Sequence, residues 1–357
     1  MEAYAIALIA VGSFLTLLIL IGVGCCARRR HARIRLDGRH VLITGGSSGL
    51  GLAIAKEAAR RGAYVTILAR TTSTLAEATA SIQQVAARPD AVQWVSADVT
   101  KLSEVEEKVK AACTAFGRPF LVLCCAGAAE PSYFLQCDPD LHRAQMDLNF
   151  HSCVNTARAC IPLMSAPASA NGGKERGESY RDTSPLLTRP KYGENGHIVF
   201  TSSLAGMTGV FGYTAYSAAK WAVRGFAESL YYELLPLGVG VSVMFPGDVD
   251  TPGYARENER KPEETKAMEG QVKCISAEKA AKKLLAGVLD RRFLVTYGDG
   301  FLLECSVFGL SPRGRALHFF LSPIVHLAKL VVVPGFEKVA RRSRYFVHAD
   351  GVSEGQV

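Results

Sequence analysis

From about residue 40 to residue 297, short apolar runs rich in β-branched residues alternate with segments of helical periodicity. This alternation is typical of parallel sheets in which each strand is followed by a helix that crosses back over the sheet. The apolar runs predict strands at His40–Thr44, Tyr64–Ala69, Val92–Ser96, Phe120–Cys124, His197–Thr201, Gly240–Phe245 and Phe293–Thr296. The intervening segments predict helices that include Leu50–Arg61, Ser103–Phe116, Leu141–Leu163 and Tyr213–Leu234. The expected fold class is α/β, a doubly wound parallel sheet of about seven strands.

The first 38 residues have the pattern of a membrane anchor with a basic juxtamembrane segment. The run from Tyr4 to Gly24 has no charged residue, and as a helix it is long enough to cross the ~30 Å hydrocarbon core of a bilayer. Five arginines follow it directly, which by the positive-inside rule places the remainder of the chain in the cytosol: Arg28, Arg29, Arg30, Arg33 and Arg35. A cleaved signal peptide is the alternative, but it would normally carry its basic residues before the apolar run.

Two further segments interrupt the alternating pattern. Residues 166–195 are rich in Gly, Ser, Pro and charge, which predicts a long disordered surface insertion between a helix and a strand. Residues 301–336 are strongly apolar but are broken by proline and charged residues. A re-entrant or interfacial helix pair and a hydrophobic flap over the active site both fit this pattern. The chain therefore divides into an anchor (1–38), one folded domain (39–300) and a membrane-associated tail with a polar end (301–357).

Composition narrows the expected partners. The chain has 357 residues, 48% of them hydrophobic, which is enough to bury the core of one large domain. The formal net charge is +8, but the basic residues form neither one long run nor a patch interleaved with aromatic residues. A lipid bilayer is thus the expected partner of the basic cluster, and no nucleic acid is expected.

A glycine-rich motif follows the first predicted strand and opens the first predicted helix of the domain. It reads Thr44-Gly45-Gly46-Ser47-Ser48-Gly49-Leu50-Gly51. Glycines at these positions allow a tight turn, and the backbone amides at the helix N-terminus attract a pyrophosphate. The motif predicts a dinucleotide site.

The end of the second predicted strand indicates which dinucleotide is bound. An NAD site usually has an acidic residue there, whereas this chain has Ala69 and Arg70. A guanidinium can pair with the 2′-phosphate of NADPH, so NADPH is the expected cofactor. The alternative is that Arg70 is a solvated loop charge.

A second group of residues has the pattern of a proton-transfer site. Tyr216 and Lys220 are four apart on a predicted helix, so their side chains lie on one face, and Ser203 precedes Tyr216 by thirteen residues. A free tyrosine has a pKa near 10, and a neighbouring ammonium is expected to lower it. Ser203 could donate a hydrogen bond to a carbonyl oxygen while Tyr216 gives that oxygen a proton.

These motifs, in this order, resemble the short-chain dehydrogenase/reductase family over about residues 39–297. The resemblance implies a Rossmann-like domain, and it assigns Asn149, Ser203, Tyr216 and Lys220 as catalytic, with Asn149 holding a water in the proton relay. It assigns further cofactor contacts beyond the glycine loop to Asp98, Val99, Ala126, Gly127, Pro246, Gly247 and Thr251. The Asn-Asn-Ala-Gly of the family reads Cys124-Cys125-Ala126-Gly127 here, and this departure puts the stabilisation of the fourth strand in doubt.

Within that family, three segments resemble members that reduce long-chain sphingoid ketones: 44–51 with 68–70, 209–224 and 250–265. This resemblance implies an enzyme of the endoplasmic reticulum membrane whose active site faces the cytosol. A steroid, retinal or ketoacyl substrate and a non-catalytic NADPH-binding scaffold remain the alternatives, and a homo-oligomer is a further expectation. Because a sphingoid ketone carries an ammonium, a carboxylate is expected near the pocket mouth, with four candidates: Glu257, Glu259, Glu263 and Glu264.

Overall fold

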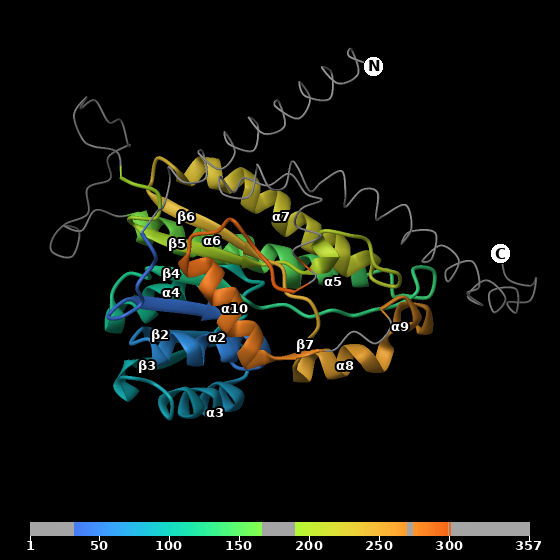
Figure 1. Ribbon diagram of the computed structural model, residues 1–357, viewed down its shortest axis with the longest axis horizontal. Helices are drawn as coiled ribbons and strands as arrows, with labels where there is room; N and C mark the ends of the chain where they lie inside the picture. The colour runs from blue at the N-terminus through green and yellow to red at the C-terminus, as the bar shows by residue number, and fades with distance from the viewer. Residues whose placement is uncertain (1–31, 166–189, 270–273, 299, 301–357) are drawn as a thin grey trace, which may run out of the picture.

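The computed structural model describes residues 32–165, 190–269, 274–298 and 300, and its centre is a seven-stranded parallel sheet (Figure 1). The strand order is β3-β2-β1-β4-β5-β6-β9. Strands β2 and β3 are added on one side of β1 and strands β4 to β9 on the other, so the order of the strands reverses between β1 and β4. The strands are β1 (His40–Thr44), β2 (Tyr64–Ala69), β3 (Val92–Ser96), β4 (Leu121–Cys124), β5 (Gly196–Thr201), β6 (Val239–Met244) and β9 (Leu294–Val295). Ligands in such sheets bind at the carboxyl edge, next to the reversal.

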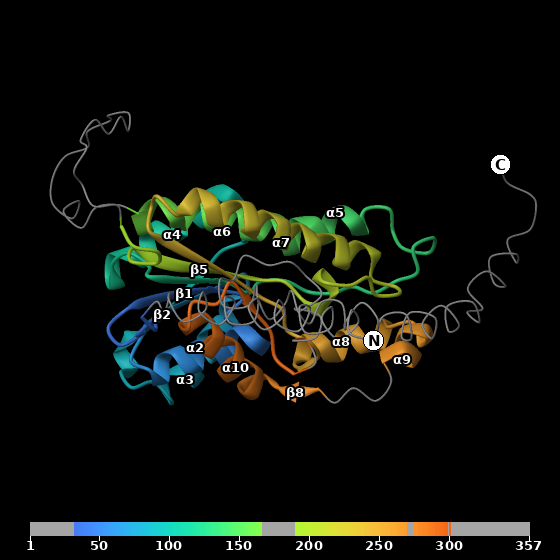
Figure 2. The same cartoon turned by 45° about the horizontal axis from the view of Figure 1, so that its top comes forward.

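Both faces of the sheet are covered by helices, which Figures 1 and 2 show as two layers. One face packs against α2 (Gly49–Arg60), α3 (Thr72–Gln83) and α10 (Ala277–Leu289). The other packs against α4 (Leu102–Phe116), α6 (Ser152–Ser165) and α7 (Thr214–Leu234). Neighbouring residues of β1 alternate between the layers, since Val41 and Ile43 join the first core cluster and Leu42 the second.

The central strands are buried on both faces, which explains why the sequence shows them as nearly continuous apolar runs. The buried polar side chains within the sheet are hydrogen-bonded across strands. His40 Nε2 lies 2.8 Å from Thr66 Oγ1, and His197 Nε2 lies 2.7 Å from Ser242 Oγ. Each pair satisfies one ring nitrogen of a buried histidine, whose burial without a partner would be costly.

The seven predicted strands are confirmed, with ends that differ by at most one residue. The predicted helix Leu141–Leu163 is divided, because α5 (Leu141–Met146) passes through a π-helical turn, η2 (Asp147–His151), into α6. Sequence patterns did not predict the secondary structure of the segment between β6 and α10. There, a short parallel pair, β7 (Val249–Asp250) and β8 (Ile275–Ser276), accompanies α8 (Pro252–Arg260) and α9 (Glu263–Glu269). We call residues 252–269 the cover segment.

Core packing begins earlier than the predicted domain boundary, and described structure also falls within the last part of the predicted insertion. Ile34 and Leu36 are buried, and the Ile34 N–H donates to the Leu289 carbonyl, so core packing starts before residue 39. At the other boundary, Tyr192 is anchored within the predicted disordered segment 166–195. Its hydroxyl donates to the Val241 carbonyl and accepts from the Val241 N–H, both at 3.0 Å. The side chain of Tyr192 is thus fixed in a segment that residue composition predicted to be a disordered insertion.

No helix within the described ranges is long and apolar enough to cross a membrane. Residues 1–31 of the predicted anchor, most of the predicted insertion (166–189) and the predicted tail (301–357) lie outside the described residues. The predictions for those segments therefore stay predictions.

Candidate active site

The glycine motif forms the loop between β1 and α2 at the carboxyl edge of the sheet. Gly45 has a φ of +66°, and a Cβ placed there would lie 2.8 Å from the backbone of Ala126 in the loop after β4. Gly51 allows the first turn of α2 to approach the loop, since its Cβ would lie 2.3 Å from the Gly45 carbonyl oxygen. Both contacts require glycine, and together they leave a bare backbone surface for a cofactor.

The N-terminus of α2 is suited to a pyrophosphate. Ser48 occupies the N-cap position without a side-chain capping hydrogen bond, and the first turn contains no acidic residue. Gly49 has a φ of +54°, and the side chain of Thr251 lies 3.2 Å from the position of its missing Cβ. The free N–H groups and positive end of a twelve-residue helix favour an anion here, with Ser47, Leu50 and Thr251 at the rim.

Thr44 supports the loop that faces the glycine motif. Its hydroxyl accepts a 3.4 Å hydrogen bond from the Ala126 N–H, and its carbonyl accepts from the Cys125 N–H. Cys125 Sγ also accepts from the Thr201 hydroxyl at 3.5 Å. These contacts hold the loop that contains Ala126 and Gly127, although the first asparagine of the family pattern is a cysteine here.

Arg70 and Asp98 lie together at the carboxyl ends of β2 and β3. Burial alone would raise the pKa of Asp98, but hydrogen bonds from the Thr100 N–H (3.0 Å) and hydroxyl (2.8 Å), with the charges of Arg70 and Lys101, lower it. The exposed Arg70 guanidinium makes no ion pair with any residue that the structure describes. It is free to meet an anion, while Asp98, next to buried Val99, is fixed as an acceptor.

Tyr216, Lys220 and Ser203 are brought together by helix α7 and the end of β5. Ser203 follows β5 and caps the short helix η4 (Leu204–Gly206), and its hydroxyl is hydrogen-bonded to Tyr216. Lys220 is buried, and its Nζ donates to the Thr201 carbonyl at 3.0 Å and lies 5.4 Å from the centre of the Tyr216 ring. The hydroxyls of Tyr216 and Ser203 are therefore close enough to donate to the same ligand atom, and the ammonium of Lys220 lies near the Tyr216 ring.

Asn149 joins this group from the π-helical turn η2. Its amide nitrogen donates to the Ala128 carbonyl and to Gln145, while its fully buried Oδ1 has no partner among the described residues. That oxygen lies 2.6 Å, and Lys220 Nζ 3.2 Å, from the position of a Cβ on Gly127. An unsatisfied buried acceptor beside an ammonium is suited to hold a water, and single π-helical turns often occur at functional sites.

The expected lowering of the Tyr216 pKa by Lys220 is not found in this structure. Burial raises the pKa of Tyr216 well above its usual value, the charges of Glu257 and Asp248 raise it further, and only the Ser203 hydrogen bond lowers it. Burial likewise lowers the pKa of Lys220. Tyr216 thus keeps its proton at neutral pH, which is the state required of an acid that protonates a carbonyl oxygen.

The cover segment is held over the site by hydrogen bonds to the chain that precedes α7. The Tyr213 hydroxyl donates to Glu257 at 2.6 Å, the Tyr133 hydroxyl donates to Glu264 at 2.7 Å, and Thr265 donates to the Phe211 carbonyl at 2.7 Å. Of the four predicted carboxylates, only Glu257 has a charge that acts on Tyr216. Glu259 is exposed, and Glu263 pairs with Lys266 on the surface.

Two residues of the site were missed by sequence patterns. Tyr213 precedes Tyr216 by one helical turn, and Asp248 directly follows Pro246-Gly247. The spacing of Tyr213 could have indicated its place on the same face of α7. No sequence signal places Asp248 near Tyr216, because the approach depends on how the β6–β7 connection turns.

The family model described as short chain dehydrogenase matches residues 39–174 and 181–262. The chain belongs to the short-chain dehydrogenase family. It is accordingly an oxidoreductase that interconverts alcohol and carbonyl groups with a nicotinamide cofactor. The glycine cradle and the uncapped helix fit such a cofactor.

Three relatives in this short-chain dehydrogenase family show how far the similarity extends. The chain is 35% identical to a 3-dehydrosphinganine reductase of Danio rerio, over 78% of this chain and 77% of the relative. It is 34% identical to a 3-ketodihydrosphingosine reductase of Bos taurus, with the same coverage. A 3-ketodihydrosphingosine reductase of Dictyostelium discoideum is 29% identical over 85% of this chain and 89% of the relative.

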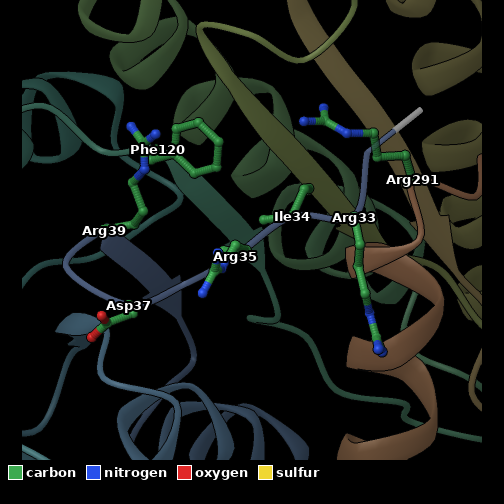
Figure 3. Close-up of a pocket in the computed structure, with 7 residues that line it drawn as sticks. All are labelled: Arg33, Ile34, Arg35, Asp37, Arg39, Phe120 and Arg291. Atoms are coloured by element: carbon green, nitrogen blue, oxygen red, sulfur yellow. The ribbon is translucent and has the colours of Figure 1, made fainter.

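A basic surface pocket lies at the amino edge of the sheet, beside the residues that lead into β1 and β4 (Figure 3). It is lined by Arg33, Ile34, Arg35, Asp37, Arg39, Phe120 and Arg291. Arg33 is paired with Asp290 at 3.2 Å, and Arg291 donates to the backbone of Ala32 and Tyr192. Arg35 and Arg39 give the pocket a positive charge, and both are close in sequence to the residues that precede the domain.

Proposed function

We propose that this protein is a membrane-bound reductase that uses NADPH to convert the ketone of 3-ketodihydrosphingosine to the alcohol, dihydrosphingosine. The observation that carries the proposal is its similarity to reductases named for this substrate over about three quarters of both chains. The match with the Danio rerio protein covers 282 residues, which is more than the cofactor-binding half of the domain alone.

NADPH is proposed over NADH because of the charge at the end of β2. Arg70 is exposed, and within the described part of the chain it has no ion-pair partner. A guanidinium there attracts a 2′-phosphate, and the end of β2 carries Ala69 and Arg70 in place of the acidic residue that would hold a ribose 2′-hydroxyl. Residues of the glycine loop would hold the pyrophosphate, and Asp98 and Val99 would border the adenine.

In the proposed reaction the protein supplies a proton and orients the ketone. A bound NADPH supplies the hydride for the ketone carbon. Tyr216 gives its hydroxyl proton to the ketone oxygen, and Ser203 donates a hydrogen bond to the same oxygen as negative charge develops on it. Lys220 and a water held by Asn149 Oδ1 then return a proton to Tyr216. The ketone gains one hydride and one proton, and so becomes a secondary alcohol.

We also propose that the enzyme is anchored in the endoplasmic reticulum membrane with its catalytic domain facing the cytosol. The charge-free run of residues 4–24 and the five arginines that follow it support this. The basic pocket of Arg33, Arg35 and Arg39 continues that positive charge onto the folded domain. A ketone with a long alkyl chain partitions into a bilayer, so an enzyme on its surface meets a high local concentration of substrate. A homo-oligomer remains an expectation without structural support.

The test is to supply membranes that contain this protein with 3-ketodihydrosphingosine and either NADPH or NADH, and to measure dihydrosphingosine. Steroid, retinal and ketoacyl substrates are assayed in parallel, and membranes that contain the Tyr216→Phe variant are the matched control. We expect the sphingoid ketone to be reduced, and faster with NADPH. Turnover of another ketone with none of the sphingoid ketone would reject the substrate, and turnover of none despite NADPH binding would favour a non-catalytic scaffold.

A further inference from the structure

Glu257 is the carboxylate of the cover segment whose charge acts on Tyr216 and which is bonded to the neighbouring Tyr213. It accepts a 2.6 Å hydrogen bond from Tyr213, whose ring centre lies 6.0 Å from that of Tyr216. Glu257 is partly buried, yet it makes no salt bridge with a lysine or arginine of the described ranges. Lys261, one helical turn further along, is itself paired with Glu269 at 2.8 Å. The charge of Lys261 lowers the pKa of Glu257, but no lysine or arginine of the described residues lies within salt-bridge distance of this carboxylate.

Asp248 adds a second negative charge on the same side of Tyr216. It follows Pro246-Gly247 in the connection between β6 and β7, and its charge acts on both Tyr216 and Glu257. Its side chain has no hydrogen bond or ion pair to any residue that the structure describes. Two carboxylates from separate segments thus carry charges that act on one catalytic hydroxyl.

This arrangement is unfavourable for the reduction of an uncharged ketone. Negative charge develops on the ketone oxygen as hydride adds to its carbon, and nearby carboxylates oppose that charge. They also raise the pKa of Tyr216, and burial raises the pKa of Glu257 itself. A cation placed between the carboxylates and the ketone oxygen would remove this penalty. Charges that are unfavourable in the free protein often mark where a ligand of opposite charge binds.

We infer that Glu257, with Asp248 beside it, binds the ammonium group next to the ketone of a sphingoid substrate. The inference rests on the proposed function, and it identifies the residues that select an amino ketone. In an amino ketone the nitrogen is one carbon away from the carbonyl carbon, so bond lengths hold it roughly 3 Å from the ketone oxygen. A ketone oxygen held by Tyr216 and Ser203 therefore keeps the ammonium close to the Tyr216 hydroxyl, and the inference places it on the side from which the charge of Glu257 acts.

The substrate thus contributes to its own reduction. Its ammonium offsets one of the two carboxylate charges that act on Tyr216 and places a positive charge close to the developing alkoxide. A ketone of the same chain length without the amine binds more weakly, and it is reduced in the unfavourable field of Glu257 and Asp248. Selectivity for the amino ketone over other lipophilic ketones follows from electrostatics rather than from the length of the alkyl chain.

The experiment compares two substrates that differ only in the amine, 3-ketodihydrosphingosine and the corresponding long-chain 1-hydroxy-3-ketone, with wild-type protein and the Glu257→Gln variant in membranes. We expect Glu257→Gln to raise the KM for the amino ketone by roughly tenfold to a hundredfold, as for the loss of one hydrogen bond to a charged group. The KM for the amine-free ketone should stay unchanged or fall. Glu259→Gln, an exposed glutamate on the same helix, should behave as wild type.

Two further measurements separate recognition from structure. Tyr213→Phe removes the hydrogen bond that holds α8 but leaves the carboxylate, so it should affect both ketones alike. NADPH binding, followed by nicotinamide fluorescence, should be equal in all variants. An equal loss with both ketones in Glu257→Gln, or no loss with either, would overturn the inference. A wild-type protein that reduces neither ketone would reject the proposed function itself.

Discussion

The Nζ atom of Lys220 donates a 3.0 Å hydrogen bond to the carbonyl oxygen of Thr201. This bond joins α7 to the end of β5, so the helix that carries Tyr216 has a fixed position relative to the strand that leads to Ser203. Lys220 is buried without a carboxylate partner in the described residues, and burial lowers its pKa. An ammonium has three N–H donors, so those not used by Thr201 can serve a cofactor or a relay water.

The first prediction is that Tyr216→Phe nearly abolishes ketone reduction and leaves NADPH binding intact. The substitution removes the phenolic proton and keeps the ring that packs near Lys220 and Tyr213. Turnover should fall below a few per cent of wild type, since loss of general acid catalysis typically costs about 10²- to 10⁴-fold. Cofactor fluorescence titration and single-turnover kinetics measure the two properties separately. Substantial residual turnover would show that another group supplies the proton.

The second prediction concerns cofactor choice. Arg70→Asp should shift preference from NADPH toward NADH, because a carboxylate repels the 2′-phosphate and can accept a hydrogen bond from a ribose 2′-hydroxyl. The ratio of kcat/KM values for the two cofactors is the measurement. Arg118→Asp, a charge change outside the cofactor loops, is the control. An unchanged ratio in Arg70→Asp would mean that this arginine is only a solvated surface charge.

The third prediction is that Gly45→Ala greatly weakens cofactor binding. A methyl group there would lie 2.8 Å from the backbone of Ala126, at a φ of +66° that side chains rarely adopt. The two loops would be forced apart where the pyrophosphate is expected. Gly209→Ala is the matched control, since nothing lies within 4 Å of its Cβ position and it does not have a positive φ. Isothermal titration with NADPH measures the affinity of both variants. Equal affinities would contradict the steric argument.

The fourth prediction is a loss of stability in acid caused by His197. Burial lowers the pKa of this histidine from 6.5 to about 3, helped by the charge of Arg291. Between these values the unfolded chain binds a proton that the folded protein does not, so stability is complete above pH 6.5 and falls as the pH drops toward 3. His40, whose pKa burial also lowers, acts in the same direction.

Urea denaturation at about pH 7 and about pH 5 measures this effect. His197→Gln should lose less free energy of unfolding between the two conditions than wild type, although it starts from a lower value. His151→Gln changes an exposed histidine and should keep the wild-type dependence. Equal pH dependence in all three proteins would show that His197 does not titrate differently in the folded and unfolded states.

The strands, the glycine loop and the Tyr216–Lys220 pair could be predicted from sequence because each depends on short-range patterns. A strand buried on both faces must be apolar along its length, as β1, β5 and β6 are. Gly45 and Gly51 are required by a local turn and by the close approach of the first turn of α2 to the loop after β1. Residues four apart on a helix share a face whatever the rest of the chain does. The order of these motifs was enough to indicate the family.

The cover segment, the surroundings of Tyr216 and the split in the 141–163 helix were decided only by the tertiary structure. Glu257 reaches Tyr213 across 44 residues of sequence, and which of four glutamates does so depends on how α8 packs. The pKa of Tyr216 was expected to fall because Lys220 is its neighbour in the helix, yet it rises because folding removes water from the phenol and brings two carboxylates close. Desolvation and long-range charge are properties of the assembled core, so a local pattern of residues does not contain them.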